Sequence, residues 1–338
     1  MMFATVVAAS AQTQMANSDF EEWTSTSKGS AVPKEWHSFS DADCQLKGIY
    51  SWGCSFMQTN HSSRVSGHGG YGCEIEASTI AATALVNGVI TTGQMVFAST
   101  STKSEENHTY SDIANRCGHG AAMHFTGLPD SVYFWCRFDM KKRGNTAVAK
   151  FHLHTATEYK DISTHRASTP QPGKVGNAFC EMTDPGDGLW HRYGFGFTYY
   201  DENSGTTTAN GRKPQYILAS FSTNKIAKGG NSGDKLAIDE IRMVYNKRLS
   251  LLEIDGKPVE GFNPDRGEYM IEWADRETVP QVSANAQSGN ATVEVDSSDF
   301  LNSGSIRIIV SHDDGCNVYT LRQGSENAIA QKSEPNMQ

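Results

Sequence analysis

The chain has 338 residues, a length that suits one large domain or two of ordinary size. Hydrophobic residues make up 38% and charged residues 20%, which provides enough apolar material for a buried core and excludes a disordered chain. The net charge of -9 argues against nucleic acid or an anionic membrane as a partner, because both require clustered lysine and arginine. The sequence contains no run of about 20 apolar residues that would span a bilayer.

The first 11 residues have the pattern of the end of a signal peptide. Residues 3–11 form a short apolar run, and the triplet ASA at positions 9–11 fits the small-x-small pattern that precedes a cleavage site. The charged start of such a peptide is missing, so we expect residues 1–11 to be a signal-peptide remnant; a disordered N-terminus is the alternative. Export would place the protein in the periplasm, at the cell surface or outside the cell.

The cysteine count bears on the same question. An exported chain would carry its seven cysteines into an oxidising compartment, where disulfides form. Seven is odd, so at least one thiol stays free or pairs with another chain. The spacing contains no C-x-x-C pair, which argues against a zinc ribbon or a thioredoxin-like site, and the pairing cannot be deduced from the sequence.

Residues 12–247 are predicted to form a jelly-roll β-sandwich. Short runs of β-branched and aromatic residues alternate with polar residues and are separated by clusters of Gly, Asn, Asp and Ser, while helical periodicity is nearly absent. Many short strands in succession are typical of a sandwich of two sheets. The predicted strands cover residues 93–98, 122–126, 131–139, 147–155, 192–200, 215–222 and 236–245.

The strand predicted over residues 131–139 has two different faces. One carries Val132, Phe134, Cys136 and Phe138, and the other carries Tyr133, Trp135 and Arg137. Because both faces cannot line the same core, we expect one to face the interior and the other an open sheet surface. The run 192–200 alternates likewise, and its glycines would leave a flat floor on one face. The remaining tryptophans considered, Trp23, Trp36, Trp52 and Trp190, are expected to fill the core or to cover the ends of the sandwich.

Residues 248–322 are predicted to form a smaller, Ig-like β-sandwich. The dipeptide Asp255-Gly256 is a hairpin signal that follows the apolar run 251–254. Further short strands are predicted over residues 268–273, 281–284, 291–296, 305–311 and 318–321. The segment 323–338 is polar, so we expect it to be a disordered tail.

Several short segments occur in an order known from exported jelly-roll domains. They are residues 17–23 (NSDFEEW), 32–36 (VPKEW), 93–97 (GQMVF), 120–135 (GAAMHFTGLPDSVYFW), 214–217 (PQYI) and 237–245 (AIDEIRMVY). That order resembles the PCMD family, a carbohydrate-metabolism domain of exported Bacteroidetes proteins, over roughly residues 17–246. Residues 254–262 (IDGKPVEGF) and 313–319 (DDGCNVY) are similar to Ig-like or cadherin-like modules of polysaccharide-utilisation proteins.

The resemblance implies a cell-envelope protein that captures or processes glycans. It implies no catalytic residues, because the activity of the family is poorly defined. The C-terminal module would then serve as a spacer or would dock on a partner in the envelope. We therefore expect an exported accessory protein whose ligand is a polysaccharide or oligosaccharide; a glycoside hydrolase on the same sandwich and a structural or adhesion protein without a sugar ligand are the alternatives.

The predicted glycan-binding residues are Tyr133, Trp135, Arg137, His152 and His154. Aromatic planes stack on the apolar faces of sugar rings, and the two histidines show the same alternation on a strand that we expect to be a neighbour. Packing of the aromatic residues beneath a loop or against the second domain is the alternative. For the histidine pair, which shares a strand face, metal coordination is a further alternative, with His124 or His191 as a third ligand.

A structural Ca²⁺ is expected between the first and last strands of the jelly roll, with Glu21 (or Asp19) and Asp239 as ligands. Asp239 alternates with apolar residues on its strand, so its carboxylate points toward an apolar face and needs a cation or several hydrogen bonds. A hydrogen-bonded aspartate at a strand end is the alternative. No organic cofactor is expected.

Hydrolysis of a glycosidic bond would require two facing carboxylates. Glu74 and Glu76 have the spacing that places both on one face of a strand. A solvated strand face explains the same pattern, so we assign no catalytic residue.

Overall fold

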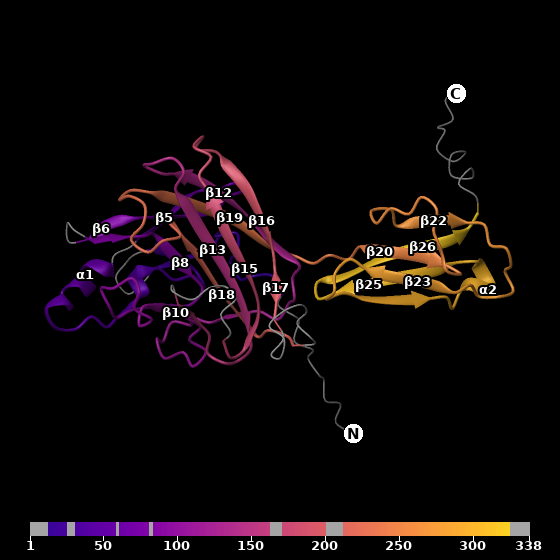
Figure 1. The fold of residues 1–338 in the computed structure, drawn as a ribbon, viewed down its shortest axis with the longest axis horizontal. Helices are drawn as coiled ribbons and strands as arrows, with labels where there is room; N and C mark the ends of the chain where they lie inside the picture. The colour runs from indigo at the N-terminus through magenta and orange to yellow at the C-terminus, as the bar shows by residue number, and fades with distance from the viewer. Residues whose placement is uncertain are drawn as a thin grey trace, which may run out of the picture. The chain divides into compact units, whose positions relative to one another are not determined.

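The computed structural model describes residues 13–25, 31–58, 61–80, 84–162, 171–200 and 212–324. The signal-peptide remnant predicted for residues 1–11 and most of the tail predicted from residue 323 lie outside the described residues. Almost all regular structure is β-strand (Figure 1), which confirms the all-β prediction. The chain divides into two compact units, with the boundary between Val244 and Tyr245.

The first sheet of the N-terminal unit has five strands in the order β16-β12-β19-β5-β4, and every neighbouring pair is antiparallel. Figure 1 shows β16, β12 and β19 side by side. The strands are β4 (Ser62–Ser66), β5 (Tyr71–Glu76), β12 (Ser131–Asp139), β16 (Trp190–Gly196) and β19 (Lys235–Val244).

The second sheet has six strands in the order β11-β18-β13-β15-β17, and β8 pairs with the same edge of β18 as β11 does. The strands are β8 (Val89–Thr91), β11 (Met123–His124), β13 (Thr146–His154), β15 (Lys174–Thr183), β17 (Thr198–Tyr199) and β18 (Tyr216–Ser222).

The hydrophobic core lies between these two sheets. The ring centroid of Phe134 on β12 is 5.0 Å from that of Phe221 on β18 and 5.9 Å from that of Phe151 on β13. All three phenylalanines are fully buried. Because alternate residues of a strand point to opposite faces, this packing directs Tyr133 and its alternating neighbours away from the core.

A third layer covers part of the six-stranded sheet on the side away from the core. It is a four-stranded sheet in the order β14-β10-β9-β3, and its strands are β3 (Asp43–Cys44), β9 (Gln94–Phe97), β10 (His108–Tyr110) and β14 (Lys160–Ile162). The ammonium of Lys150 on β13 contacts the carboxylate of Asp161 on β14 at 2.9 Å and so links the two layers.

Two hairpins and three short helices complete the described part of this unit. They are β1 (Trp23–Ser25) with β2 (Ala31–Pro33), β6 (Ser78–Ile80) with β7 (Ala84–Val86), the 3-10 helices η1 (Phe39–Asp41) and η2 (Gly48–Tyr50), and α1 (Gly53–Met57). Within the described ranges, the chain forms no helix with the length and apolar character needed to cross a membrane.

The C-terminal unit is a smaller pair of sheets, in the orders β21-β20-β23 and β22-β26-β25-β24. Its elements are β20 (Leu249–Ile254), β21 (Lys257–Pro258), β22 (Glu268–Ile271), β23 (Val282–Ala286), β24 (Thr292–Asp296), α2 (Phe300–Ser303), β25 (Ile306–His312) and β26 (Gly315–Gln323). Leu252, Ile308 and Tyr319 pack in one buried cluster that both sheets contribute to. The predicted hairpin is present: Asp255 and Gly256 both have positive φ, 48° and 74°, as a type I′ turn requires.

Candidate functional site

The predicted aromatic residues of β12 lie on the outer face of the five-stranded sheet. Along this strand the buried residues alternate with Tyr133, Trp135 and Arg137, all of which are half-buried. We call the surface that they share with neighbouring strands the outer sheet face; it consists of Tyr133, Trp135, Arg137, Trp190, Arg192 and Arg242.

Strand register arranges this face in three rows that each pair an aromatic residue with an arginine. The rows pair Tyr133 with Arg242 of β19, Trp135 with Arg192 of β16, and Arg137 with Trp190 of β16. The sequence interpretation missed three of these six residues. Arg192 carries a signal that was not used, because it alternates with the glycines whose flat face was predicted.

The cations of this face lie over its aromatic rings. The guanidinium carbon of Arg192 lies 4.0 Å from the centroid of the Tyr133 ring, and that of Arg137 lies 5.1 Å from the Trp190 ring. The imidazole of His68, from the turn between β4 and β5, stacks on the indole of Trp135 at 3.7 Å. The two arginine contacts are attractive because a ring face is electron-rich, and all three contacts hold the rings in defined orientations.

The glycines of β16 leave open space beside Tyr133. Gly194 lies opposite Tyr133 in the ladder, and Gly196 lies opposite Ser131. A Cβ atom built on either glycine would have no neighbour closer than 3.8 Å. The flat floor that we expected from the sequence is therefore present, next to an aromatic side chain.

The two predicted calcium ligands both contact the turn that carries His68. The carboxylate of Asp239 is fully buried and accepts hydrogen bonds from the backbone N–H groups of His68 (2.8 Å), Gly69 (3.0 Å) and Glu240 (2.7 Å). Burial raises the pKa of Asp239, while these backbone donors act in the opposite direction. Glu21 accepts a hydrogen bond from the N–H of Tyr71 at 2.7 Å.

These hydrogen bonds match the alternative to a calcium ligand, namely an aspartate that is hydrogen-bonded at this position. Among the residues that the structure describes, no group of three or more His, Cys, Asp or Glu side chains is placed to hold a metal ion. The calcium site stays a prediction from the sequence.

The structure does not bring His152 and His154 to the outer sheet face. Both lie on β13, in the six-stranded sheet, whereas β12 has β16 and β19 as its neighbours. His154 accepts or donates a hydrogen bond at Nε2 with the hydroxyl of Ser111 (2.8 Å), and His152 does so at Nδ1 with the hydroxyl of Tyr159 (3.2 Å). Their exposed fractions are 5% for His152 and 0% for His154. Burial lowers the pKa of each histidine to about 4, because the imidazolium would lose its water.

A cavity of about 480 Å³ lies against the outer side of the six-stranded sheet. Its lining is mostly apolar and includes Tyr50, Trp52 and Phe97, together with the ion pair of Lys150 and Asp161. Trp52 is 57% exposed, so it neither fills the core nor covers an end of the sandwich as expected. Of the four tryptophans considered, Trp36 is fully buried as a core residue.

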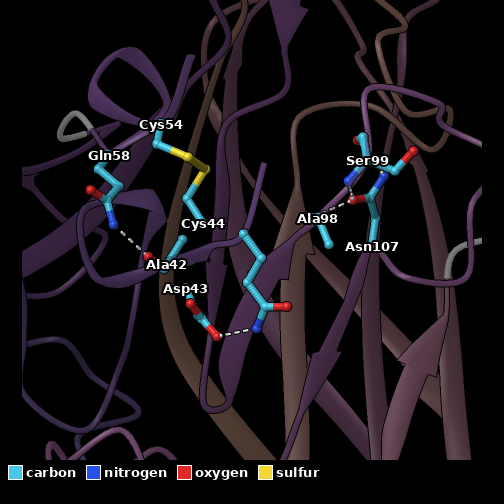
Figure 2. Close-up of a disulfide and its surroundings, with 9 residues drawn as sticks. Ala42, Asp43, Cys44, Cys54, Gln58, Ala98, Ser99 and Asn107 are labelled. Carbon is cyan, nitrogen blue, oxygen red and sulfur yellow. Dashed lines mark hydrogen bonds between the residues drawn. A yellow bond between two sulfur atoms is a disulfide. The ribbon is translucent and has the colours of Figure 1, made fainter. Parts of the chain in front are cut away.

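A disulfide closes the segment that carries Tyr50 and Trp52. Figure 2 shows the bond between Cys44 and Cys54, next to a hydrogen bond of 2.8 Å from the side-chain amide of Gln58 to the carbonyl oxygen of Ala42. On the other side of the same figure, the side-chain oxygen of Asn107 accepts hydrogen bonds from the N–H groups of residues 98 and 99. These contacts shape two segments that line the cavity.

The carboxylates considered for hydrolysis share one lysine. The ammonium of Lys235 on β19 lies 3.0 Å from Glu74 and 3.5 Å from Glu76, and hydrogen bonding to Glu74 raises the pKa of Lys235. Neither glutamate lines the cavity. The pair thus forms a small ion-pair network on the sheet.

Comparison with known proteins gives similarity of fold at low sequence identity. No protein-family model and no curated protein matches the sequence. The chain is similar to a candidate glycoside hydrolase of Bacteroides vulgatus (14% identity, 70% of this chain and 99% of that chain covered, TM-score 0.43). It is also similar to a candidate glycoside hydrolase of Bacteroides thetaiotaomicron (13%, 70% and 72%, TM-score 0.43) and to a carbohydrate-binding module specific for non-crystalline cellulose (9%, 71% and 99%, TM-score 0.31). At these TM-scores the similarities assign neither a family nor an activity to this chain.

Proposed function

We propose that this protein binds glycans on its outer sheet face. The observation that carries the proposal is the set of three consecutive rows, each with one aromatic residue and one arginine, beside the open floor at Gly194 and Gly196. Aromatic rings offer apolar area for the faces of sugar rings at a small cost in side-chain entropy. Arginine offers several N–H donors in a rigid fork, which suits the hydroxyl groups at the rim of a sugar.

The stacked side chains favour binding by preorganisation. His68 lies against Trp135, and Arg192 lies against Tyr133, so both rings are held in place before any ligand arrives. A ligand that meets ordered side chains avoids the loss of rotamer entropy that otherwise weakens association. The half-buried state of these rings agrees with a surface that is rigid and still accessible.

The proposed biological role is that of an exported accessory protein in polysaccharide utilisation, with the C-terminal unit as a spacer or a docking element. The Cys44–Cys54 disulfide supports the export part of this role, because such bonds persist mainly in oxidising compartments. Binding is favoured over hydrolysis because both carboxylates considered for catalysis contact Lys235.

A glycan-array screen of the full chain, followed by titration calorimetry on each hit, tests the proposal. Trp135→Ala should weaken binding at least tenfold, since a central tryptophan commonly contributes about 2 kcal/mol or more to an interface. Trp52→Ala is the matched control, because it removes an exposed tryptophan from the cavity rim instead.

The two variants separate the possible sites. Loss of binding in Trp135→Ala alone supports the outer sheet face, whereas loss in Trp52→Ala alone assigns binding to the cavity and overturns the proposal. Chromatography of each mixture detects cleaved sugar, and a cleaved product would make the protein a hydrolase. Absence of binding to any glycan would also overturn the proposal and favour a structural or adhesion role.

A further inference from the structure

We propose that the outer sheet face selects glycans that carry anionic groups, carboxylate or sulfate, and binds those groups with Arg137, Arg192 and Arg242. This inference rests on the proposed glycan binding and adds the chemical class of the ligand. Its starting point is that, within the described ranges, none of these three arginines forms an ion pair, although acidic residues outnumber basic ones by 38 to 29 in the chain.

Four carboxylates on the same sheet already have partners. Glu240 contacts the imidazole of His68 at 2.9 Å, and Asp239 accepts three backbone N–H groups. Glu74 and Glu76 share the ammonium of Lys235. These four carboxylates are thus engaged with protein donors, while the three guanidinium groups are left for a ligand.

Other arginines of the described ranges fall into two groups. Arg116 contacts Glu158, Arg248 contacts Asp265, and Arg322 contacts Glu268. A second group also forms no ion pair within the described ranges: Arg64, Arg143, Arg276 and Arg307. What distinguishes the outer sheet face is that three such arginines gather on one surface, to which an anion supplied by the ligand would be complementary.

The contacts of these guanidinium groups suit an anion. The guanidinium carbon of Arg192 lies over the ring of Tyr133, and that of Arg137 lies over the ring of Trp190. A guanidinium carries its N–H donors in its own plane and binds a carboxylate or sulfate with them in a forked geometry. The negative net charge of the protein would repel an anionic ligand, but this long-range repulsion is weak at physiological salt, where the screening length is about 8 Å.

The spacing of the arginines favours a polymer over a single small anion. They lie on three adjacent strands and in three successive rows. With strands about 4.8 Å apart and a rise of about 3.4 Å per residue, their Cα atoms are separated by roughly 8 to 14 Å. A chain with repeated anionic substituents can contact all three guanidinium groups along its length.

A nucleic acid is the less favoured polymer. Its backbone carries a charge at every nucleotide and is bound by continuous cationic tracks. Here the arginines alternate with aromatic rings and do not form such a track.

The test compares ligands that differ only in charge. Calorimetric titration of the full chain uses polygalacturonate against its fully methyl-esterified form, dextran sulfate against dextran, and oligodeoxythymidylate of 20 nucleotides as the nucleic-acid probe. We expect at least tenfold tighter binding of one charged glycan than of its neutral counterpart, and weaker binding as salt is raised. The pair that shows the difference identifies carboxylate or sulfate as the recognised group.

Substitutions of single arginines test whether the outer sheet face causes the selectivity for charged glycans. Arg192→Gln and Arg242→Gln should each reduce the preference for the charged glycan at least fivefold, and Arg192→Lys should restore it only in part because lysine lacks the fork. Arg322→Gln, in the other unit and ion-paired to Glu268, is the matched control and should leave binding unchanged. Far-UV circular dichroism and melting curves verify that each variant is folded.

Equal affinity for charged and neutral glycans would overturn the acidic selectivity and leave the proposed glycan binding intact. Absence of binding to every glycan would instead remove the proposed function itself. Tighter binding of the oligodeoxythymidylate than of the charged glycans, lost in Arg192→Gln, would replace the inference with nucleic-acid binding.

Discussion

The imidazole of His68 stacks on the indole of Trp135, with ring centroids 3.7 Å apart and an angle of 11° between the ring planes. His68 lies in the turn between β4 and β5, whereas Trp135 lies on β12, two strands away from β5 in the sheet. The contact therefore places this turn over the outer sheet face. Asp239 holds the turn from below through the N–H groups of His68 and Gly69.

Removal of Trp135 should cost little stability compared with removal of its neighbour Phe134. Trp135 is half-buried on the outer sheet face, whereas Phe134 is fully buried against Phe151 and Phe221. We expect Trp135→Ala to lower the melting temperature by only a few degrees and Phe134→Ala to cost about 3 to 5 kcal/mol. Differential scanning calorimetry measures both. An equal loss in the two variants would place Trp135 in the core and contradict its assignment to a binding surface.

Asp239→Asn should destabilise the N-terminal unit by about 1 to 3 kcal/mol. The carboxylate accepts three backbone N–H groups, and an amide would direct its own N–H₂ at one of those donors and leave the donor unsatisfied. Glu22→Gln is the control, since Glu22 only pairs with Lys34 at the surface and such pairs contribute about 0 to 1 kcal/mol.

Melting curves measure the loss of stability in Asp239→Asn, and they also test the predicted calcium site. If hydrogen bonding is the whole role of Asp239, wild-type protein has the same melting temperature in EDTA and in millimolar CaCl₂. A calcium-dependent rise that Asp239→Asn and Glu21→Gln abolish would instead support a calcium site at these two residues. The outcome thus decides between the two explanations for a buried aspartate at the end of the jelly roll.

The Cys44–Cys54 disulfide should stabilise the protein by about 3 kcal/mol. It closes a loop with a sequence separation of 10 residues, and the chain-entropy model gives about this value for so short a loop. The double variant Cys44→Ser/Cys54→Ser should unfold at lower urea concentration, and a reductant should no longer affect it. Cys316→Ser, which removes an exposed free thiol, should leave stability unchanged.

Thiol counting provides an independent check on this bond. Five of the seven cysteines are free, so titration of the denatured, unreduced protein should find five thiols, and seven after reduction. A count below five without reductant would indicate an additional bond, within the chain or between chains.

Stability should fall as the pH drops from 6.5 toward 4. His152 and His154 have pKa values lowered to about 4 in the folded protein, against an ordinary value of 6.5. The unfolded chain therefore takes up protons first, and each histidine costs up to about 1.4 kcal/mol per pH unit across this window. Above pH 6.5 both states are neutral at these positions, so this contribution to stability is fully present there.

Urea unfolding at several pH values between 7 and 4 measures this dependence, and His152→Gln should reduce its slope by about one proton. Burial is the largest influence on the pKa of His152; Asp161 raises it, while Lys150, Lys174 and His154 lower it. A slope that is the same in wild-type protein and His152→Gln would show that the pKa of His152 is the same in the folded and unfolded states, which contradicts the expected shift.

Strands in which one face is apolar and the other is not could be predicted from the alternation of residues in the sequence. The strand predicted over residues 131–139 has these bounds in the structure, and the strands predicted over 147–155 and 236–245 differ from β13 and β19 by one residue at each end. The hairpin turn at Asp255 and Gly256 was equally readable, because only a few residue pairs tolerate two successive positive φ values.

β15 was not predicted because the first half of the strand does not alternate, although buried and exposed residues alternate from residue 178 to residue 183. It is a long strand paired on both edges, and its first five residues are all buried. Gly176 in this strand resembles a loop residue, yet a Cβ atom there would lie 2.8 Å from the ring of Tyr199. Gly176 therefore has the local pattern of a turn residue, but glycine is required there because two strands pack closely.

Composition and a period of two were enough to predict that the chain is all-β and which side chains of a given strand point the same way. Which strands are neighbours could be learned only from the folded chain. His152 alternates on β13 as Trp135 does on β12, but β13 lies in the other sheet, beneath the layer of β10 and β14. Arg192 and Arg242 join Trp135 from distant parts of the chain because hydrogen-bond register, which no local pattern encodes, places them in adjacent rows.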